Sequence, residues 1–230
     1  MLKLQQTISR FPIAMFALSI FVANTMIAEQ SIAGQSITGQ RVDVLSLPDI
    51  SDWEQEIFSD ETRYEIVTVE DKPLLKAIAD STASGMVRHI DIDLTKTPYM
   101  NWSWKIENIL SNVDETQKSG DDYAARVYVV ISGGFLFWKT RAISYVWASN
   151  KPKESHWPNA FTENALMIAS QSGDEYVGDW INEKRNILDD IQNLLGIDAT
   201  EINGVAIMTD TDNSKQSATA YYGNIFFTAQ

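Results

Sequence analysis

Alternating apolar and polar residues run along most of this chain and predict β-strands. The segment "TRYEIVTVEDKPLLKAIAD" (62–80) alternates β-branched or aromatic residues with polar ones, and its break at Asp71-Lys72-Pro73 is typical of a hairpin. The same strand-length pattern, interrupted by Gly, Pro, Asn or Asp, recurs at 84–94, 99–109, 122–132, 135–149, 164–170, 201–209 and 219–227.

One segment departs from this pattern and has helical spacing. In "RNILDDIQNLLG" the apolar residues fall on one helical face and Gly196 provides a stop signal; these residues are Ile187, Leu188, Ile191, Leu194 and Leu195. About ten strands, one short helix near 187–195 and no alternation of strands with helices predict an all-β fold, an antiparallel β-sandwich of the jelly-roll kind. The absence of a fixed-period repeat disfavours a propeller or a solenoid.

The N-terminus has the pattern of a signal peptide. Lys3 and Arg10 precede an uncharged run at 11–23, and about 13 apolar residues are fewer than the roughly 20 that a membrane-spanning helix needs. We predict a signal peptide at 1–28, with cleavage after Ala28 or Ala33, and no stable membrane insertion afterwards. A buried first helix or an uncleaved anchor is the alternative. A polar leader (29–45) and one domain (46–230) would follow, in a periplasmic or secreted protein.

Composition narrows the possible partners and chemistry. The chain contains no Cys, which excludes disulfides, a Cys nucleophile and a thiolate metal site. Its formal charge is −13, and without residues 1–33, which hold Lys3, Arg10 and Glu29, it becomes −14. This excess of negative charge repels phosphate backbones, so nucleic acid is not an expected partner.

The two histidines, His89 and His156, give little support to metal or triad catalysis. Zinc sites normally need more nitrogen ligands, and no H-E-x-x-H spacing occurs. The residue counts leave a Ser-His-Asp triad open, but the G-x-S-x-G nucleophile elbow is missing.

The acidic stretch "TDTDNS" (209–214) is the first candidate site. Asp210, Asp212 and Asn213 could offer three oxygen ligands to Ca²⁺, the one cofactor that the sequence suggests. The stretch fails as an EF-hand, because Lys215 stands where Gly is needed and Tyr221 where a bidentate Glu is needed. Two readings therefore stay open: a turn in which Asp and Asn bond their own backbone, and a metal or ligand site assembled from separate loops.

A second group of polar residues lies at 121–128. Arg126 and Tyr128 share one strand face, and the opposite face, with Val127 and Val129, is apolar. An arginine there can bind a carboxylate in bidentate fashion. That carboxylate could belong to a structural aspartate, such as Asp122 or Asp210, or to a ligand.

Aromatic pairs form the third constellation. Trp102 and Trp104 alternate on one strand, and Tyr145 and Trp147 do the same on another. Such stripes suit sugar binding, in which pyranose C–H faces stack on rings, but they equally suit the core between two sheets.

Several motifs in order also resemble a known family. They are "TPYMNWSWKI", "GDDYAARVYVV", "AISYVWAS", "GDWINEKRNILDDIQNLLG" and "GVAIMTDTDNSKQSATAYYGNIFF", and together they resemble the DUF3047 family of bacterial secreted proteins over roughly 50–228. The family has no assigned function. At the level of the fold it looks distantly like galactose-binding and carbohydrate-binding jelly rolls, an analogy that carries little functional weight.

Three hypotheses follow from the sequence. The first, which we favour, is a non-catalytic binding module for a glycan or a polar small molecule. The second is a carboxylate-dependent polysaccharide hydrolase or lyase, and the third is a structural or interaction protein of the cell envelope. The predicted ligand-binding residues are Asp121, Asp122, Arg126, Tyr128, Tyr145, Trp147, Asp210, Asp212, Asn213 and Tyr222.

Overall fold

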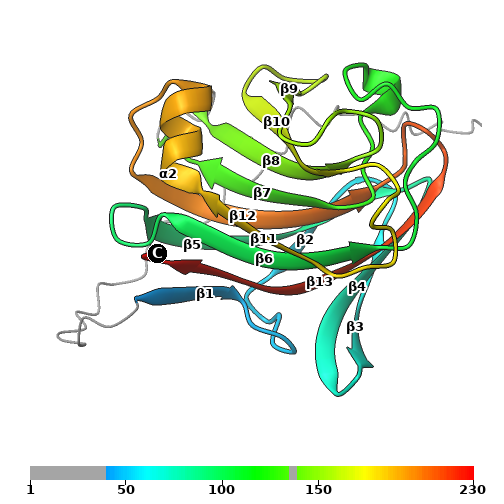
Figure 1. Cartoon of the computed structure of the whole chain (residues 1–230), viewed down its shortest axis with the longest axis horizontal. Coiled ribbons are helices and arrows are strands. Elements are labelled where there is room, and N and C mark those ends of the chain that lie inside the picture. Colours follow the sequence, from blue (N-terminus) through cyan, green and yellow to red (C-terminus); the bar gives the residue numbers. More distant parts are fainter. Residues whose placement is uncertain (1–39, 135–138) are drawn as a thin grey trace, which may run out of the picture.

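Two β-sheets pack face to face in the computed structural model, which describes residues 40–134 and 139–230 (Figure 1). The predicted signal peptide and most of the predicted leader lie outside the described residues. The strands are β1 (Arg41–Leu45), β2 (Glu54–Ser59), β3 (Arg63–Val69), β4 (Lys72–Asp80), β5 (Ala83–Asp93), β6 (Tyr99–Ile106), β7 (Arg126–Ile131), β8 (Arg141–Ala148), β9 (His156–Pro158), β10 (Ala165–Ser172), β11 (Ile181–Asn186), β12 (Glu201–Asp210) and β13 (Ser217–Thr228).

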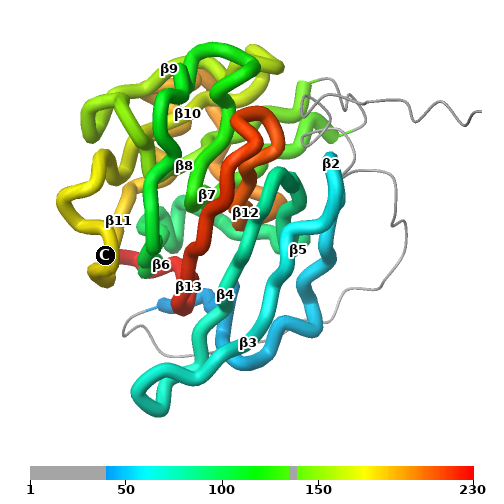
Figure 2. The backbone as a smooth tube through the Cα atoms, turned by 90° about the vertical axis from the view of Figure 1, so that its right-hand side faces the viewer, coloured from blue at the N-terminus to red at the C-terminus, as the bar shows by residue number. Residues whose placement is uncertain are grey.

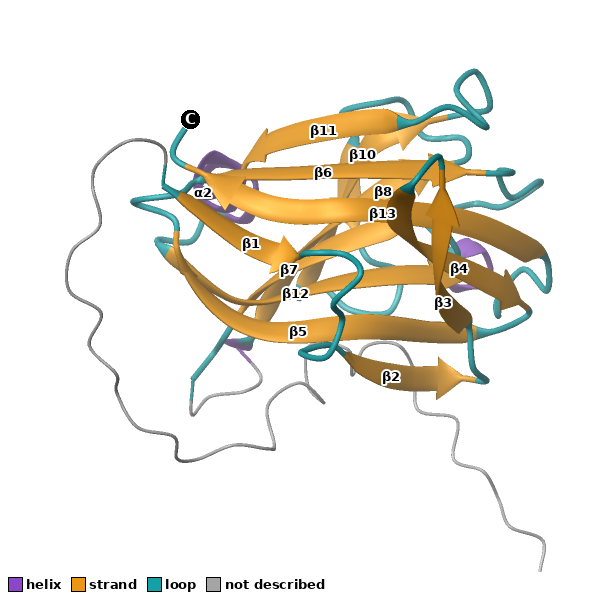
Figure 3. Cartoon of the chain, turned by 90° about the horizontal axis from the view of Figure 1, so that it is seen from below, coloured by secondary structure: helices purple, strands orange, loops and turns teal. Residues whose placement is uncertain are grey.

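The two sheets have different strand orders. The six-stranded sheet runs β11-β6-β13-β4-β3, with β1 also paired to β13, and the seven-stranded sheet runs β2-β5-β12-β7-β8-β10-β9. Figure 2 shows β13 beside β4, and Figure 3 shows the strands of the six-stranded sheet from below. The predicted all-β, jelly-roll-like sandwich is confirmed, although the pairing of β8 with β10 is parallel.

Every strand predicted from alternation is present, and four further strands were missed. These are β1, β2, β9 and β11. Residues 41–45 belong to β1 and not to a flexible leader, because Val44 and Leu45 are fully buried and the strand pairs with β13. Residues 41–45 are therefore part of the six-stranded sheet.

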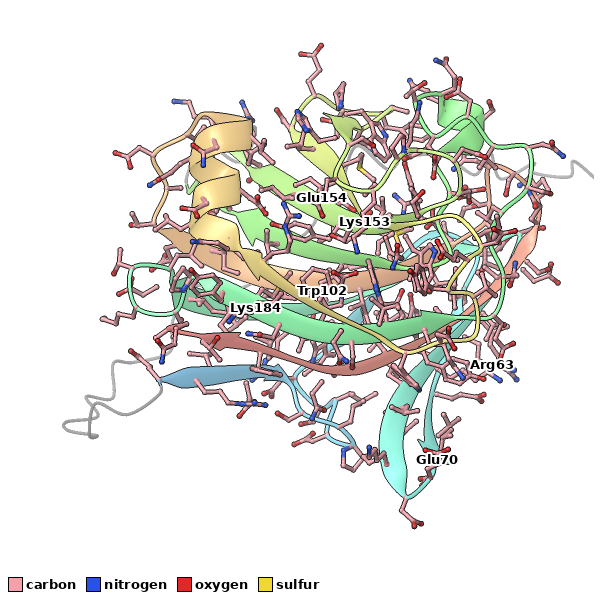
Figure 4. The ribbon with its side chains drawn as sticks, in the orientation of Figure 1. Arg63, Glu70, Trp102, Lys153, Glu154 and Lys184 are labelled. Carbon is pink, nitrogen blue, oxygen red and sulfur yellow. The ribbon has the colours of Figure 1, made fainter. Side chains whose placement is uncertain are left out.

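The β3–β4 hairpin turns slightly earlier than predicted. Its two loop residues, Glu70 and Asp71, both have positive φ angles, 50° and 59°, as a two-residue type I′ turn requires. Lys72 and Pro73 belong to β4. The hairpin projects from the body of the sandwich, with Glu70 at its tip (Figure 4).

The main core lies between the sheets and follows the alternation of their strands. On β6 the buried residues are Met100, Trp102, Trp104 and Ile106, and each intervening residue is partly exposed. Val127 and Val129 of β7 contribute to the same core. Burial of these apolar side chains is the main term that holds the two layers together.

The predicted helix is present near its expected bounds. Helix α2 (Ile187–Asp190) continues as a π-helical turn, η4 (Ile191–Leu195), and Gly196 ends it in the left-handed region at φ 66°. A short 3₁₀ turn, η2, spans Lys118–Gly120. In the part of the chain that the structure describes, no helix combines the length and apolar character needed to cross a bilayer.

Candidate functional site

Three of the predicted site residues form a buried ion-pair cluster where β7 begins and β12 ends. Arg126 Nε lies 2.7 Å from Asp210 Oδ1, and Nη2 contacts Asp210 Oδ2. Nη2 also donates to the backbone carbonyl of Asp121 at 2.7 Å, while Nη1 lies 3.8 Å from Asp121 Oδ1. All three side chains are fully buried. The predicted ion pair between Arg126 and an aspartate is confirmed, with Asp210 as the main partner.

Burial and the neighbouring charges shift the pKa values of the residues in this cluster. Burial lowers the pKa of Arg126, but the neighbouring Asp210 carboxylate outweighs it and leaves that pKa well above its usual value. Burial raises the pKa of Asp121 to about 6, against the opposing effect of the Arg126 charge. The guanidinium therefore stays charged. Burial also raises the pKa of Asp210 well above its usual value, against the opposing effect of the Arg126 charge.

Asp122 holds the acidic turn in place. Its Oδ1 accepts hydrogen bonds from the backbone N–H and the side-chain amide of Asn213, at 3.2 and 3.0 Å, and its Oδ2 accepts from the N–H of Ser214 at 2.5 Å. The turn is thus ordered by a residue about 90 positions away in sequence and not mainly by its own backbone.

The predicted calcium ligands come partly together. One carboxylate oxygen each from Asp122, Asp210 and Asp212 lie within 4.8 Å of one another. Asp212 is half-buried, and burial raises its pKa. Because Asp210 is paired with Arg126 and Asp122 is hydrogen-bonded to the turn, two of these three carboxylates already have partners. Calcium binding here stays a prediction.

Tyr128 and Tyr222 complete the buried corner. Tyr128 Oη accepts from Arg126 Nη1 at 3.1 Å. Tyr222 Oη donates to the carbonyl of Met208 at 2.7 Å and accepts from the backbone N–H of Arg126 at 3.3 Å. These bonds tie β7, β12 and β13 together, so the corner acts as a cross-link between the two sheets.

The aromatic pairs belong to the core. Ring centroids of Trp102 and Tyr145 lie 5.5 Å apart, and those of Trp104 and Trp147 lie 5.9 Å apart, across the interior. Tyr145 Oη donates to Asp190 at 2.8 Å, and Trp147 Nε1 donates to the carbonyl of Gly173 at 3.0 Å. Tyr145 and Trp147 therefore find their polar partners inside the protein, where each is at most 1% exposed.

An open groove lies elsewhere, on the outer face of the six-stranded sheet. It has a volume of about 480 Å³, within the range of ligand sites. None of the ten predicted site residues lines it. Its lining includes Lys72 of β4, Asn101 and Ser103 of β6, Asn182 and Lys184 of β11, and Asn224 and Phe226 of β13.

Strand register explains why these residues meet. Lys184 lies opposite Asn101, and Asn101 lies opposite Phe226, so the three form one row across β11, β6 and β13. Asn182 lies opposite Ser103 in the next row. A further row pairs Lys105 with Tyr221 and Tyr221 with Lys76 of β4. We call the whole side of the six-stranded sheet that carries the groove and this last row the outer face.

Several polar atoms of the groove are open to a ligand. The side chains of Asn182 and Ser103 make no hydrogen bond to any other described residue. Asn224 uses its Oδ1 to accept from the N–H of Leu47 at 3.1 Å, which leaves its amide N–H groups facing outward. Amide and hydroxyl groups of this kind can both donate and accept hydrogen bonds.

Aromatic rings border these polar atoms. Arg41 covers one side of Phe226, with the guanidinium carbon 3.5 Å from the ring centroid. Tyr221 is partly exposed, and Trp180, which precedes β11, is 37% exposed. The ammonium of Lys105 lies 4.6 Å from the Tyr221 ring centroid and 5.9 Å from that of Trp180.

Glu183 is an unusual carboxyl group on the edge strand β11. It lies opposite Trp102, so its side chain points toward the interior of the sandwich while Asn182 and Lys184 point outward. Burial raises the pKa of Glu183 to about 7, and Lys153 and Arg185 oppose this effect. Its Oε1 is buried without a hydrogen-bond partner among the described residues. A carboxyl group in this position exchanges its proton near neutral pH.

Charged residues from the loop between β8 and β9, from α2 and from β11 itself surround Glu183. Arg185 Nη1 lies 2.5 Å from Glu154 Oε2, and Nη2 lies 2.9 Å from Asp190 Oδ1. Figure 4 shows Lys153 and Glu154 above Trp102, on the side of the seven-stranded sheet. Sequence reasoning missed Glu183, because "INEKRN" was not identified as a strand; the isolated Glu on the same parity as Ile181 was the available signal.

Comparisons with solved structures give distant likenesses only. The chain is similar to a family 30 carbohydrate-binding module of a cellulosomal cellulase from Clostridium thermocellum, with 11% identity and a TM-score of 0.49 over 83% of this chain and 98% of that one. A lectin from Bauhinia forficata in complex with GalNAc gives 11% identity and a TM-score of 0.40 over 83% and 98%. The endoglucanase Cel12A from Rhodothermus marinus gives 7% and 0.42 over 82% and 98%. These scores support no functional inference.

A comparison with curated proteins finds no match. The family comparison is decisive, because one family model covers most of the described chain in a single stretch, residues 51–226. That stretch includes β2 to β12 and most of β13, and therefore both the buried corner and the groove. The chain belongs to DUF3047, a family of proteins of unknown function.

Proposed function

We propose that this protein is a non-catalytic binding module for a glycan or a related polar small molecule, and that the ligand lies in the groove of the outer face. One observation carries the proposal. On this rigid sheet, amide and hydroxyl groups without hydrogen-bond partners in the described part of the chain lie in rows next to rows with partly exposed aromatic rings. Sugar hydroxyls need hydrogen-bond partners, and their C–H faces stack on aromatic rings.

The groove satisfies both needs. Asn182 and Ser103 offer donors and acceptors in its lining. Outside that lining, Tyr221 and Trp180 offer rings around Lys105, two residues after Ser103 on β6. Because Asn182, Ser103 and Tyr221 stand on paired strands, little backbone conformational entropy is lost when a ligand binds.

We further propose that the protein acts in the periplasm or outside the cell, after removal of the predicted signal peptide. The N-terminal pattern supports this location. Sequencing the N-terminus of the protein recovered from cell fractions tests it: a mature end at Glu29 or Gly34 is expected, and an intact Met1 in the cytoplasmic fraction contradicts it.

A glycan array followed by calorimetry tests the binding proposal. We expect a saturable hit whose affinity falls about tenfold or more in Asn182→Ala and Tyr221→Ala, the loss of roughly one good contact. Asn203→Ala, on β12 of the other sheet, is the matched control and should bind normally. If no sugar binds across a broad array, the proposal fails and the structural role in the envelope becomes the better account.

Hydrolysis or elimination of a polysaccharide is the second candidate, and Glu183 is the observation that favours it. An acid whose pKa is about 7 can donate and accept a proton at neutral pH. Glu154 contributes a second negative charge that acts on Glu183. Glycoside hydrolysis uses two carboxyl groups of this kind.

Measurement of new reducing ends on a polysaccharide panel tests the catalytic candidate. Activity that is lost in Glu183→Gln and kept in Glu163→Gln, which replaces an exposed glutamate, would support it. The absence of turnover on the panel, with binding retained, removes it and leaves the binding module.

A further inference from the structure

The outer face gathers basic side chains in a protein with a strong negative charge. Alternation and register place six basic residues on this side of the six-stranded sheet: Arg41, Arg63, Lys72, Lys76, Lys105 and Lys184. The acidic residues of the same strands that point the same way are fewer: Asp43, Glu65 and Asp80. The face is therefore net positive, although the chain as a whole carries −13.

The four lysines of this face are available to a ligand. Arg41 pairs with Asp43 and Arg63 with Glu65, which uses two of the three acidic groups. Within residues 40–134 and 139–230, no ion pair involves Lys72, Lys76, Lys105 or Lys184. Lys72 and Lys184 stand at the groove itself.

Aromatic rings hold these ammonium groups over the face. Lys105 and Lys76 lie on either side of Tyr221, at 4.6 and 5.5 Å from its ring centroid, and Lys184 lies 4.8 Å from that of Tyr99. Cation–π contacts keep a positive charge in position without neutralising it. Two carboxylates are near: Glu65 is opposite Lys76, and Glu107 accepts from Tyr221 Oη at 2.6 Å.

We propose that the ligand of the outer face is an anionic glycan, a chain of uronic acid residues, whose carboxylates are bound by Lys105 and Lys184 while the groove amides bind its hydroxyls. This inference rests on the proposed function and specifies its ligand. Lysine to carboxylate contacts are charge-assisted. Each of the two strands presents one lysine beside uncharged polar groups: Lys105 follows Ser103 on the outward side of β6, and Lys184 lies between Asn182 and Asn186 on that of β11. A polymer with a carboxylate on every sugar can place carboxylates at both lysines while its hydroxyls meet the groups between them.

Overall charge does not contradict the proposal. The Debye length at physiological ionic strength is about 8 Å, so charges on the far side of the sandwich are screened from a ligand at the groove. The lysines that contact the ligand lie well within this distance, so their charges are not screened from it. Net repulsion slows the approach of a polyanion, whereas local attraction sets how long it stays.

Calorimetry of the full chain with polygalacturonate and with its fully methyl-esterified form tests the inference, because esterification removes the negative charges and leaves the sugar backbone and its hydroxyls unchanged. We expect the free acid to bind at least about tenfold more tightly, as one or more charge-assisted contacts imply. We also expect the affinity to fall as salt is raised from about 50 to 500 mM. Alginate, a second polyuronate, should behave like the free acid.

Lysine variants locate the effect. The double variant Lys105→Gln/Lys184→Gln should lose the preference for the free acid and its salt dependence. Lys118→Gln is the matched control, because Lys118 also lies over an aromatic ring, 5.3 Å from the Phe161 centroid, but in the turn η2 away from this sheet. It should bind as the unmodified chain does. Melting temperatures of all variants should agree, since the replaced side chains are not buried.

Each other result overturns the inference in a distinct way. Equal affinity for both polymers, or binding of neutral sugars alone, leaves a glycan module but removes the anionic ligand. If the double variant still prefers the free acid, residues other than Lys105 and Lys184 recognise the charge. Equally tight, salt-sensitive binding to phosphatidylglycerol vesicles indicates a membrane surface instead. If no glycan of any charge binds, the proposed function itself fails.

Discussion

Ser103 on β6 and Gly223 on β13 approach so closely at the floor of the groove that a Cβ atom at position 223 would lie 2.2 Å from Ser103 Oγ. Gly223 stands in the bulge between Tyr222 and Ile225, where the register of the two strands shifts. A bulge of this kind re-aims side chains, and here it sets Asn224 at the rim of the groove.

Gly223→Ala should therefore force Ser103 to move and disturb the groove. Only the terminal Ser103 Oγ is too close, so a change of its rotamer relieves the contact. We expect a loss of about 1 kcal/mol in the free energy of unfolding, together with weaker ligand binding. The double variant Ser103→Ala/Gly223→Ala removes the colliding oxygen and should regain most of the stability. Urea unfolding of the four proteins in the cycle measures this coupling; additive losses would show that the close approach does not matter.

Arg126 should be among the most costly side chains to remove. In Arg126→Met, Asp210 would remain buried without its partner, and we expect a loss of about 3–5 kcal/mol in unfolding free energy. Arg63→Met is the control: that side chain is 64% exposed and its pair with Glu65 spans 4.0 Å, so a change within about 0.5 kcal/mol is expected.

A second variant separates a structural role for this cluster from a ligand role. Arg126→Met/Asp210→Leu removes both charges together, and it should be more stable than Arg126→Met alone. A double variant as unstable as the sum of its parts would count against the ion pair as the reason. Binding of a glycan should persist wherever the fold persists, because the cluster does not line the groove.

Glu183 should make stability depend on pH between about 4 and 7. Its pKa is about 7 in the folded chain and near 4.3 when unfolded, so the folded state binds the proton more tightly. The unfolded state then carries fewer protons across this interval, and the contribution of Glu183 to stability falls as the pH rises. In Glu183→Gln this contribution is absent.

Melting temperatures at pH 5 and pH 8 measure the difference. We expect Glu183→Gln to melt at the higher temperature at pH 8, by a margin that shrinks or vanishes at pH 5. Glu163→Gln provides the control for loss of a negative charge, since Glu163 is exposed. A parallel pH profile for the unmodified chain and Glu183→Gln would show that the carboxyl group titrates normally.

Calcium provides the test of the acidic turn. Because Asp122 and Asp210 already have partners inside the protein, we expect millimolar CaCl₂ to leave the melting temperature unchanged relative to MgCl₂. A rise with calcium that disappears in Asp212→Asn, which alters the half-exposed member, would establish instead the site that the sequence predicts.

The pattern of apolar and polar residues was sufficient to predict strands that are buried on one face or on both. Strands such as β6 and β7 alternate or run apolar because one or both faces are buried, and both were predicted. Strand β11, "INEKRN", was missed because it lies at a sheet edge and its outer side chains face water. Strand β2, "EQEIFS", is likewise an edge strand with polar residues on both parities.

The same limits apply to the sites. An aspartate partner for Arg126 was predictable, because a charge within a buried strand needs one. The sequence left the choice between Asp122 and Asp210 open. The groove was not predictable from the sequence. Lys184, Asn101 and Phe226 become neighbours only because β11, β6 and β13 pair in this register, and these strands are far apart in sequence. Each of these residues alone is an ordinary surface residue.

The placement of β13 has a consequence for how the chain folds. This last strand lies in the middle of the six-stranded sheet, where it pairs with β1, β4 and β6. The sheet cannot close until residues 217–228 have left the ribosome, so β1, β4 and β6 lack their shared central partner while the chain is being made.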